Sequence, residues 1–173
     1  MLRIWRTVER TRPYARGFAL SVFGVLNFVC ATHLFVQHVG WIHSMSGPSM
    51  LPTLGVQGEW VIESRVVDPH KLSRGDLVIY ASPIDPNRLV CKRILGLPGD
   101  TVCVDPTGIR APSTEHVIVP KGHFWMIGDN AEFSRDSRFY GPVSMGLVAG
   151  KLVARVWPLR SFTVFRSNFE NID

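Results

Sequence analysis

The sequence predicts a mostly β fold: one compact antiparallel β domain preceded by a single N-terminal transmembrane helix. Two observations carry this prediction. A stretch of twenty residues, 17–36, contains no Lys, Arg, Asp or Glu, and after Val39 the pattern changes to short β-prone runs separated by Gly, Pro and Asp. With 173 residues, of which 46% are hydrophobic, the chain is long and apolar enough for one buried core and a short appendage.

The apolar stretch 17–36 is long enough to span a membrane. As a helix rising about 1.5 Å per residue it would be about 30 Å long, which matches the hydrocarbon core of a bilayer. Asn27 and His33 weaken this interpretation, because polar groups are costly at membrane depth. A cleaved signal peptide and a buried soluble helix are the alternatives, but the apolar core of a signal peptide is shorter, about 7–15 residues. We favour a spanning anchor over residues 17–39.

The positive charge of the chain is concentrated in a basic N-terminal arm, residues 1–16. The arm carries five arginines and one glutamate, whereas the rest of the chain is almost neutral and has no basic stripe. This distribution argues against a nucleic-acid partner. Basic flanks of a membrane helix stay on the cytoplasmic side, or on the matrix side in a mitochondrion. We therefore expect everything after about Gly40 to lie across the membrane from the arm.

Seven β-prone runs follow the anchor, and turn-forming residues separate them. Short strands with such punctuation are typical of a compact, mostly antiparallel β domain, which we place at residues 40–166. The last residues, 167–173, form a polar tail. The predicted strands are 59–67, 76–80, 88–95, 101–104, 116–119, 124–127 and 147–157.

The three cysteines do not have the spacing of a metal site. Cys30, Cys91 and Cys103 form no CxxC pair, and their odd number leaves at least one thiol unpaired within the chain. A Cys91–Cys103 disulfide would require adjacent strands, and we favour free thiols over it. We expect no metal and no cofactor.

Ser49 lies on a loop that two prolines stiffen. In SGPSMLPTL, residues 46–54, Pro48 and Pro52 restrict their own backbone and that of the residue before them. A nucleophile benefits from such preorganisation, and the backbone N–H of Ser49 is available to an oxyanion. From this stretch alone, a rigid turn without chemistry is the better interpretation.

A serine nucleophile needs a base, and the sequence favours a lysine over a histidine. None of the six histidines lies in a distinctive catalytic pattern, and no G-x-S-x-G elbow surrounds Ser49. Lys92 lies in LVCKRIL, residues 89–95, where strand alternation turns either Lys92 or Arg93 inward. Burial lowers the pKa of a lysine, and a neutral lysine can accept a proton. On its own, however, the pattern fits a solvated strand lysine better.

A third stretch, GDNAEFSRDSR at 128–138, holds more side-chain hydrogen-bonding groups than a simple turn needs. These groups could form an interlocked network, in which Asp136 and Arg138 would make a fixed ion pair. A solvated polar loop is an equal alternative. The polar residues concerned are Asp129, Asn130, Ser134, Asp136, Ser137 and Arg138.

Together, these three stretches resemble the type I signal peptidases, which use a serine and a lysine to remove targeting signals from proteins. The resemblance covers GPSMLPTL, CKRILGLPGD and GDNAEFSRDSRFYGPV, in the family's order and roughly its spacing, and it runs from Gly47 to Trp157. One of these motifs would be weak evidence, whereas three in order are strong evidence. The resemblance implies a serine endopeptidase whose β domain is of the signal peptidase type.

The resemblance also implies roles for single residues. Ser49 corresponds to the nucleophile and Lys92 to the general base. Ser134 matches the serine that orients the lysine, and Asp136 with Arg138 matches a structural ion pair of the family.

Three further positions concern the support of the nucleophile and its oxyanion hole. Asp129 and Asn130 belong to the supporting polar block. Some bacterial members add a serine hydroxyl to the oxyanion hole two residues before the nucleophile. That position is Gly47 here, so the backbone N–H of Ser49 is the one donor we identify.

Within the family, the sequence is most similar to the mitochondrial inner-membrane branch. Such enzymes remove hydrophobic sorting signals from precursor proteins delivered to the intermembrane space, and they work beside a related second protease subunit. The likeness implies an N-terminus in the matrix and a catalytic domain in the intermembrane space. A compact bacterial signal peptidase and an inactive membrane-anchored scaffold are the alternatives. A soluble Ser–Lys autoprotease of the repressor type is disfavoured, because residues 1–40 show no DNA-binding pattern.

The nucleophile is close in sequence to the anchor. Ten residues separate Val39 from Ser49, which is at most about 35 Å of extended chain. Met50 and Leu51 add apolar side chains next to the serine. We therefore expect the active site near the bilayer surface, with membrane lipid among the contacts of the protein.

Overall fold

A computed structural model describes residues 2–108 and 111–166 of the chain. The chain divides into two compact units, residues 1–39 and 40–173. The predicted polar tail, 167–173, lies outside the described residues.

The first unit is one long helix. Helix α1 spans Leu2–His38, and its segment Gly17–His38 is long and apolar enough to cross a membrane. None of that segment is buried within the structure. Two of its hydroxyls bond inside the helix, Ser21 to the carbonyl of Gly17 and Thr32 to that of Phe28, so these polar groups do not need water.

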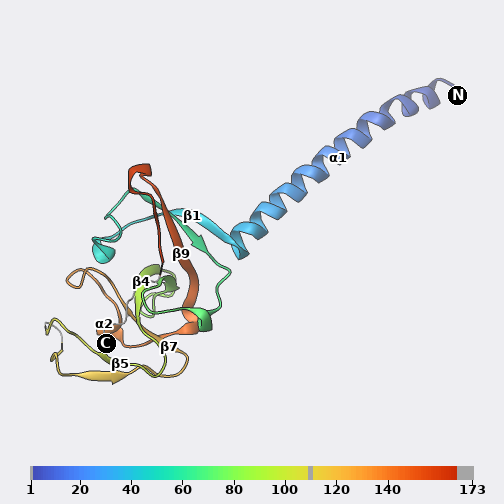
Figure 1. The fold of residues 1–173 in the computed structure, drawn as a ribbon. Helices are drawn as coiled ribbons and strands as arrows, with labels where there is room; N and C mark the ends of the chain where they lie inside the picture. The colour runs from blue at the N-terminus through green and yellow to red at the C-terminus, as the bar shows by residue number, and fades with distance from the viewer. Residues whose placement is uncertain (1, 109–110, 167–173) are drawn as a thin grey trace. The chain divides into compact units, whose positions relative to one another are not determined.

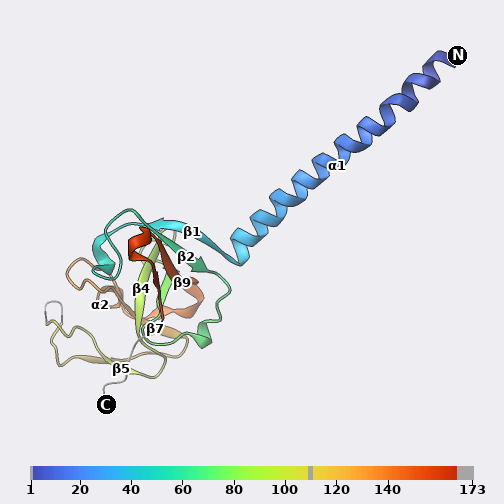
Figure 2. The same cartoon turned by 45° about the horizontal axis from the view of Figure 1, so that its top comes forward.

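The second unit is built on an antiparallel sheet that curls around its core (Figures 1 and 2). Within the described residues, its strands follow one another in the order β1-β2-β9-β3-β4-β7-β8, and β10 pairs with β9. A separate hairpin, β5–β6, lies at the end of the domain away from β1 in both views. The strands are β1 Gly40–Met45, β2 Glu59–Ser64, β3 Leu77–Ala81, β4 Leu89–Gly96, β5 Thr101–Cys103, β6 His116–Ile118, β7 His123–Ile127, β8 Val143–Ser144, β9 Val148–Trp157 and β10 Thr163–Val164.

The prediction of a mostly antiparallel β domain is confirmed. Each of the seven predicted runs overlaps a strand, β2 to β7 and β9. The structure adds β1 immediately after α1, and the short strands β8 and β10. Strand β1 pairs with β2 over its whole length, from Gly40 opposite Ser64 to Met45 opposite Glu59. It lies at the edge of the sheet and keeps Trp41 and Ile42 exposed, so it lacks the alternation of apolar and polar residues that predicts a half-buried strand.

Two apolar clusters pack against β3 and β4 and support different parts of the site. One cluster contains Ile79 and Cys91, and it also buries Met50 and Leu54 from the loop around Ser49. The other contains Val78, which lies opposite Lys92 in the β3–β4 register, together with residues of β4 and β7. Burying a side chain of this size contributes about 1.5–3 kcal/mol, so Met50 and Leu54 fix the serine loop to the core.

The three thiols are free in the structure. Cys30 is exposed on α1, Cys91 is buried, and Cys103 is half-buried. Burial raises the pKa of the Cys91 thiol to about 12, which keeps it protonated and unreactive.

Candidate active site

Ser49 is held on a short 3-10 turn, Pro48–Met50, that ends in the apolar core. Gly47 precedes the turn with φ 122°, a conformation that favours glycine, and its N–H donates to the carbonyl of Val56 at 2.8 Å. On the other side, the N–H of Leu54 donates to the carbonyl of Met50 at 2.8 Å. The loop is therefore fixed at both ends, and Ser49 itself is half-buried.

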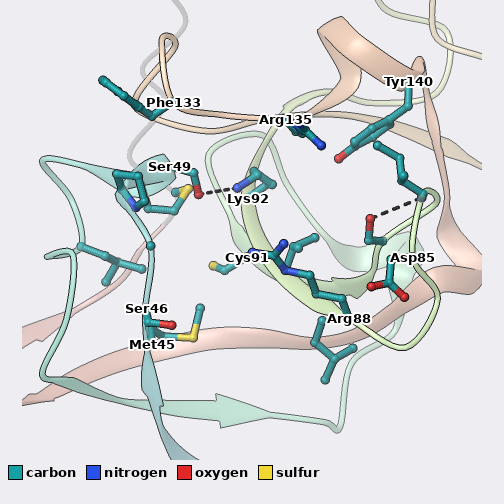
Figure 3. Close-up of a pocket in the computed structure, with 18 of the residues that line it drawn as sticks. Met45, Ser46, Ser49, Asp85, Arg88, Cys91, Lys92, Phe133, Arg135 and Tyr140 are labelled. Carbon is teal, nitrogen blue, oxygen red and sulfur yellow. Dashed lines mark hydrogen bonds between the residues drawn. The ribbon is translucent and has the colours of Figure 1, made fainter.

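Lys92 extends from β4 to the serine. Its side chain is almost completely buried, and its Nζ lies 2.5 Å from Ser49 Oγ (Figure 3). No ion pair between Lys92 and a carboxylate occurs in the part of the chain that the structure describes. Burial lowers the pKa of Lys92 below its usual value, and the nearby positive charge of Arg88 adds to this effect. A lysine in this position can be neutral near physiological pH more readily than a solvated one.

The next residue, Arg93, lies on the opposite side of β4 and is paired. Its Nη2 lies 2.6 Å from Asp129 Oδ2, and its Nε lies 2.8 Å from Asp129 Oδ1. The hydrogen bonds that Arg93 donates to Asp129 raise the pKa of Arg93, so its guanidinium keeps its charge. Asp129 also accepts a hydrogen bond from the hydroxyl of Thr53 at 2.5 Å.

Asn130 holds the backbone of the nucleophile. Its N–H donates to the carbonyl of Ser49 at 3.0 Å, and its Nδ2 donates to the carbonyl of Pro48 at 3.1 Å. Gly128 lies against the same backbone, because a Cβ at this position would overlap the Ser49 carbonyl and Ser134 Oγ. The segment 128–130 thus clamps the serine loop from a distant part of the sequence.

Asp136 and Arg138 form a buried ion pair that supports this segment. Arg138 donates from Nη2 to Asp136 Oδ2 at 2.7 Å and from Nε to Asp136 Oδ1 at 2.9 Å. The N–H of Gly128 donates to Asp136 Oδ2 at 2.9 Å. Burial alone would raise the pKa of Asp136, but the hydrogen bonds from Arg138 and Gly128 outweigh it and hold that pKa below its usual value. Asp136 also caps helix α2, Ser137–Tyr140.

Ser134 also lies in this region, and its predicted role of orienting Lys92 stays a prediction. Its side chain is 1% exposed and lies against Gly128. The hydroxyl lies near Asp136 and helps to lower the pKa of that carboxyl.

A cleft opens beside Ser49 and Lys92, between the end of β1 and the beginning of β4. Figure 3 shows Phe133 and Arg135 on one side of the two residues, and Met45, Ser46 and Arg88 on the other. No histidine lines this cleft, and no cluster of metal-binding side chains occurs among the described residues. A His-based triad therefore has no structural support here.

Thr53, Arg93 and Gly128 belong to the loop around Ser49 or contact its supports, and no role was predicted for them from the sequence. The available signals were weak. Arg93 was recognised as one of two adjacent cations on a strand, but its carboxylate partner is 36 residues away in sequence.

Comparison with known proteins identifies the family to which this chain belongs. Residues 16–111 and 107–157 match the family model described as signal peptidase, peptidase S26. The chain belongs to this family, which also confirms the resemblance seen in the three motifs.

Its relatives include mitochondrial inner membrane proteases. The chain is 43% identical over 136 residues to mitochondrial inner membrane protease subunit 1 of Schizosaccharomyces pombe, covering 78% of this chain and 84% of that protein. It is 37% identical to the human protein of the same name, covering 83% and 85%. It is also 41% identical to subunit 2 of Saccharomyces cerevisiae, covering 70% and 71%. A crystal structure of a signal peptidase I from Enterococcus faecalis matches with 26% identity and a TM-score of 0.38, covering 48% of this chain and 97% of that one.

Proposed function

We propose that this chain is a membrane-bound serine endopeptidase that removes hydrophobic sorting sequences from proteins delivered to the mitochondrial intermembrane space. Ser49 is the nucleophile and Lys92 is the general base. The observation that carries the proposal is the 2.5 Å separation of Ser49 Oγ and Lys92 Nζ, at a buried lysine that has no carboxylate partner among the described residues.

The reaction follows from this pair. Neutral Lys92 accepts the proton of Ser49 Oγ as the oxygen attacks the scissile carbonyl. The resulting lysinium then gives its proton to the leaving amine, and an acyl-enzyme on Ser49 is formed. Lys92, neutral again, accepts a proton from the attacking water and returns it to Ser49 Oγ as the bond between Oγ and the acyl group breaks.

The oxyanion is stabilised by the backbone of Ser49. As the second residue of a 3-10 turn, Ser49 has an N–H without a partner inside the turn. Gly47 has no side chain that could add a second donor. The hydrogen bonds from Asn130 to the carbonyls of Pro48 and Ser49 fix the peptide that carries the one donor we assign.

The helix supports a location at the inner membrane, which the names of the relatives also indicate. We infer that the basic arm lies in the matrix and the β domain in the intermembrane space, following the positive-inside rule. The short connection from Val39 to Ser49 keeps the cleft near the bilayer. The cross-strand pair Trp60 and Trp157 is about half exposed and offers lipid an aromatic surface of the kind found at membrane interfaces.

We infer that the chain works with a related second protease subunit. The relatives include both subunit 1 and subunit 2 of the yeast inner membrane protease, so two homologous chains occur together in one organism. Pull-down of the tagged chain from solubilised inner membranes tests this inference. Recovery of a second family member supports it, and recovery of the tagged chain alone contradicts it.

The decisive experiment compares precursor processing in membranes by wild type, Ser49→Ala, Lys92→Ala and Lys92→Arg. All three variants are expected to be inactive, since arginine cannot give up its proton. Undiminished cleavage by any of these variants would contradict the assignment of Ser49 and Lys92 as the catalytic pair. An inactive scaffold predicts that the wild type does not cleave either.

The alternative function, that of a compact bacterial signal peptidase, is tested by the location of the β domain in the cell. A C-terminal tag, followed by fractionation and protease treatment, reports where the β domain lies. We expect the tag to be protected from protease in intact mitochondria and to be digested after the outer membrane is ruptured. Digestion of the tag in intact mitochondria contradicts the assigned orientation.

A further inference from the structure

Thr53 connects the serine loop to an ion pair on another part of the domain. Its hydroxyl donates to Asp129 Oδ2 at 2.5 Å and accepts from Arg93 Nη2 at 3.2 Å. Its carbonyl accepts from Arg155 Nη1 at 3.0 Å. One residue of the loop is therefore bound by three charged side chains from separate segments.

The two residues that bond the Thr53 hydroxyl, Arg93 and Asp129, are next in sequence to residues of the site. Arg93 follows Lys92 on β4, and Asp129 precedes Asn130, which holds the carbonyl of Ser49. Thr53 itself is four residues after Ser49 on the same loop. A displacement of Thr53 would therefore be transmitted to the serine along the loop, while the lysine stays on its strand.

The ion pair does not need Thr53 for its own stability. Arg93 and Asp129 are joined by two hydrogen bonds of 2.8 and 2.6 Å, and Arg93 Nη1 also donates to the carbonyl of Gly75 at 2.8 Å. Removal of the Thr53 hydroxyl leaves these contacts in place. The hydroxyl therefore serves the loop: it attaches the loop to a rigid, charged anchor.

We propose that Thr53 is a positioning residue that sets the distance between Ser49 Oγ and Lys92 Nζ by attaching the serine loop to the Arg93–Asp129 pair. This inference rests on the proposed Ser49–Lys92 mechanism. A misplacement of a reacting group by about 1 Å can cost about 100-fold in rate, so a small movement of the loop is enough to matter.

Thr53→Val tests the proposal, because valine keeps the shape of threonine and removes the hydroxyl. On a precursor peptide in detergent, with the full-length chain and any partner subunit that it requires, kcat is expected to fall about 10- to 100-fold. KM should stay within about twofold, because Thr53 does not line the cleft. Thr53→Ser keeps the hydroxyl and should retain most of the wild-type kcat. Thr101→Val, an exposed position on β5, is the matched control and should leave kcat unchanged.

The outcomes separate positioning from simple stability. A kcat of Thr53→Val within twofold of wild type overturns the proposal, as does a Thr53→Ser variant that is as impaired as Thr53→Val. If Thr53→Val does not fold, Thr53→Ala removes the same hydroxyl without crowding, and its kcat per folded molecule decides by the same criterion. Ser49→Ala is measured in parallel: if it still cleaves, the dyad itself is wrong, whereas an inactive Ser49→Ala with an unaffected Thr53→Val rejects the positioning role alone.

Discussion

Lys92 and Arg93 are adjacent cations on β4 that meet opposite electrostatic environments. Arg93 donates to both oxygens of Asp129, whereas the Lys92 amine meets the neutral hydroxyl of Ser49 in a buried site. Strand geometry makes this possible, because successive side chains lie on opposite sides of the sheet. Arg93 therefore keeps a permanent charge that Asp129 balances. The charge of Lys92 is easier to lose, because burial lowers the pKa of the lysine.

Replacement of Lys92 by methionine should stabilise the protein and abolish its activity. The lowered pKa of Lys92 means that the folded state binds fewer protons than the unfolded state, so the lysine destabilises the fold below its ordinary pKa of 10.5. As the pH falls from 10.5 to the lowered pKa of Lys92, the stability advantage of Lys92→Met should grow by about 1.4 kcal/mol for each pH unit. Denaturant unfolding of both proteins at several pH values measures this difference. An advantage that does not change with pH would contradict the protonation argument.

The rate of cleavage should rise with pH as Lys92 loses its proton. Since the neutral amine is the base, kcat/KM should increase about tenfold per unit below the pKa of Lys92 and level off above it. The lowered pKa places the midpoint of this rise below 10.5. A pH–rate profile measures the midpoint, and a rate that is still rising at 10.5 would exclude a depressed lysine as the base.

Arg88→Gln should move that midpoint to higher pH. The positive charge of Arg88 lowers the pKa of Lys92, so its removal makes the lysine harder to deprotonate. Arg160→Gln is the matched control, because Arg160 is exposed and does not line the cleft. Equal midpoints in Arg88→Gln and wild type would show that Arg88 does not influence the base.

Gly128→Ala should reduce both the stability of the β domain and its catalytic rate. The added methyl would overlap the Ser49 carbonyl and Ser134 Oγ, and overpacking of this kind costs about 1–3 kcal/mol. Because the displaced carbonyl belongs to the nucleophile, we expect kcat to fall at least about tenfold. Gly146→Ala is the control, since its methyl would meet only Ser144 Oγ at 3.6 Å. Similar kcat values for the two variants would contradict a close fit at Gly128.

Asp136→Asn should destabilise the β domain strongly. The substitution leaves the buried guanidinium of Arg138 without its counter-charge, which costs about 3–5 kcal/mol for pairs of this type. The free energy of unfolding, measured in denaturant, reports the loss. The double variant Asp136→Asn with Arg138→Met removes both charges and should recover part of it. A double variant less stable than Asp136→Asn would argue against an uncompensated charge as the cause.

Local patterns in the sequence were sufficient to predict the strands but not their neighbours. Runs such as 89–95 and 147–157 are rich in apolar and β-branched residues and have turn residues at their ends. Their positions in the sheet depend on which apolar faces meet in the core. Strand β9 pairs with both β2 and β3, and no short-range signal indicates this arrangement.

The site shows the same division between local and long-range information. Asp136 and Arg138 are two residues apart, so their ion pair could be expected from a short stretch. The contact of Asn130 with Pro48 joins residues 82 positions apart, and it depends on the sheet register that brings the two loops together. The family motif implies that Ser134 orients Lys92, and this role stays a prediction; the structure adds that Ser134 lies beside Gly128 and Asp136, a position that short-range patterns do not indicate.

The supports of the serine loop come late in the chain. Ser49 lies near the start of the β domain, but the carbonyl of Pro48 is held by Asn130, 82 residues later, and that of Thr53 by Arg155, 102 residues later. A nascent chain that has not yet been extended to Arg155 carries the nucleophile without these contacts. The loop around Ser49 can therefore reach its final, supported conformation only when synthesis of the β domain is nearly complete.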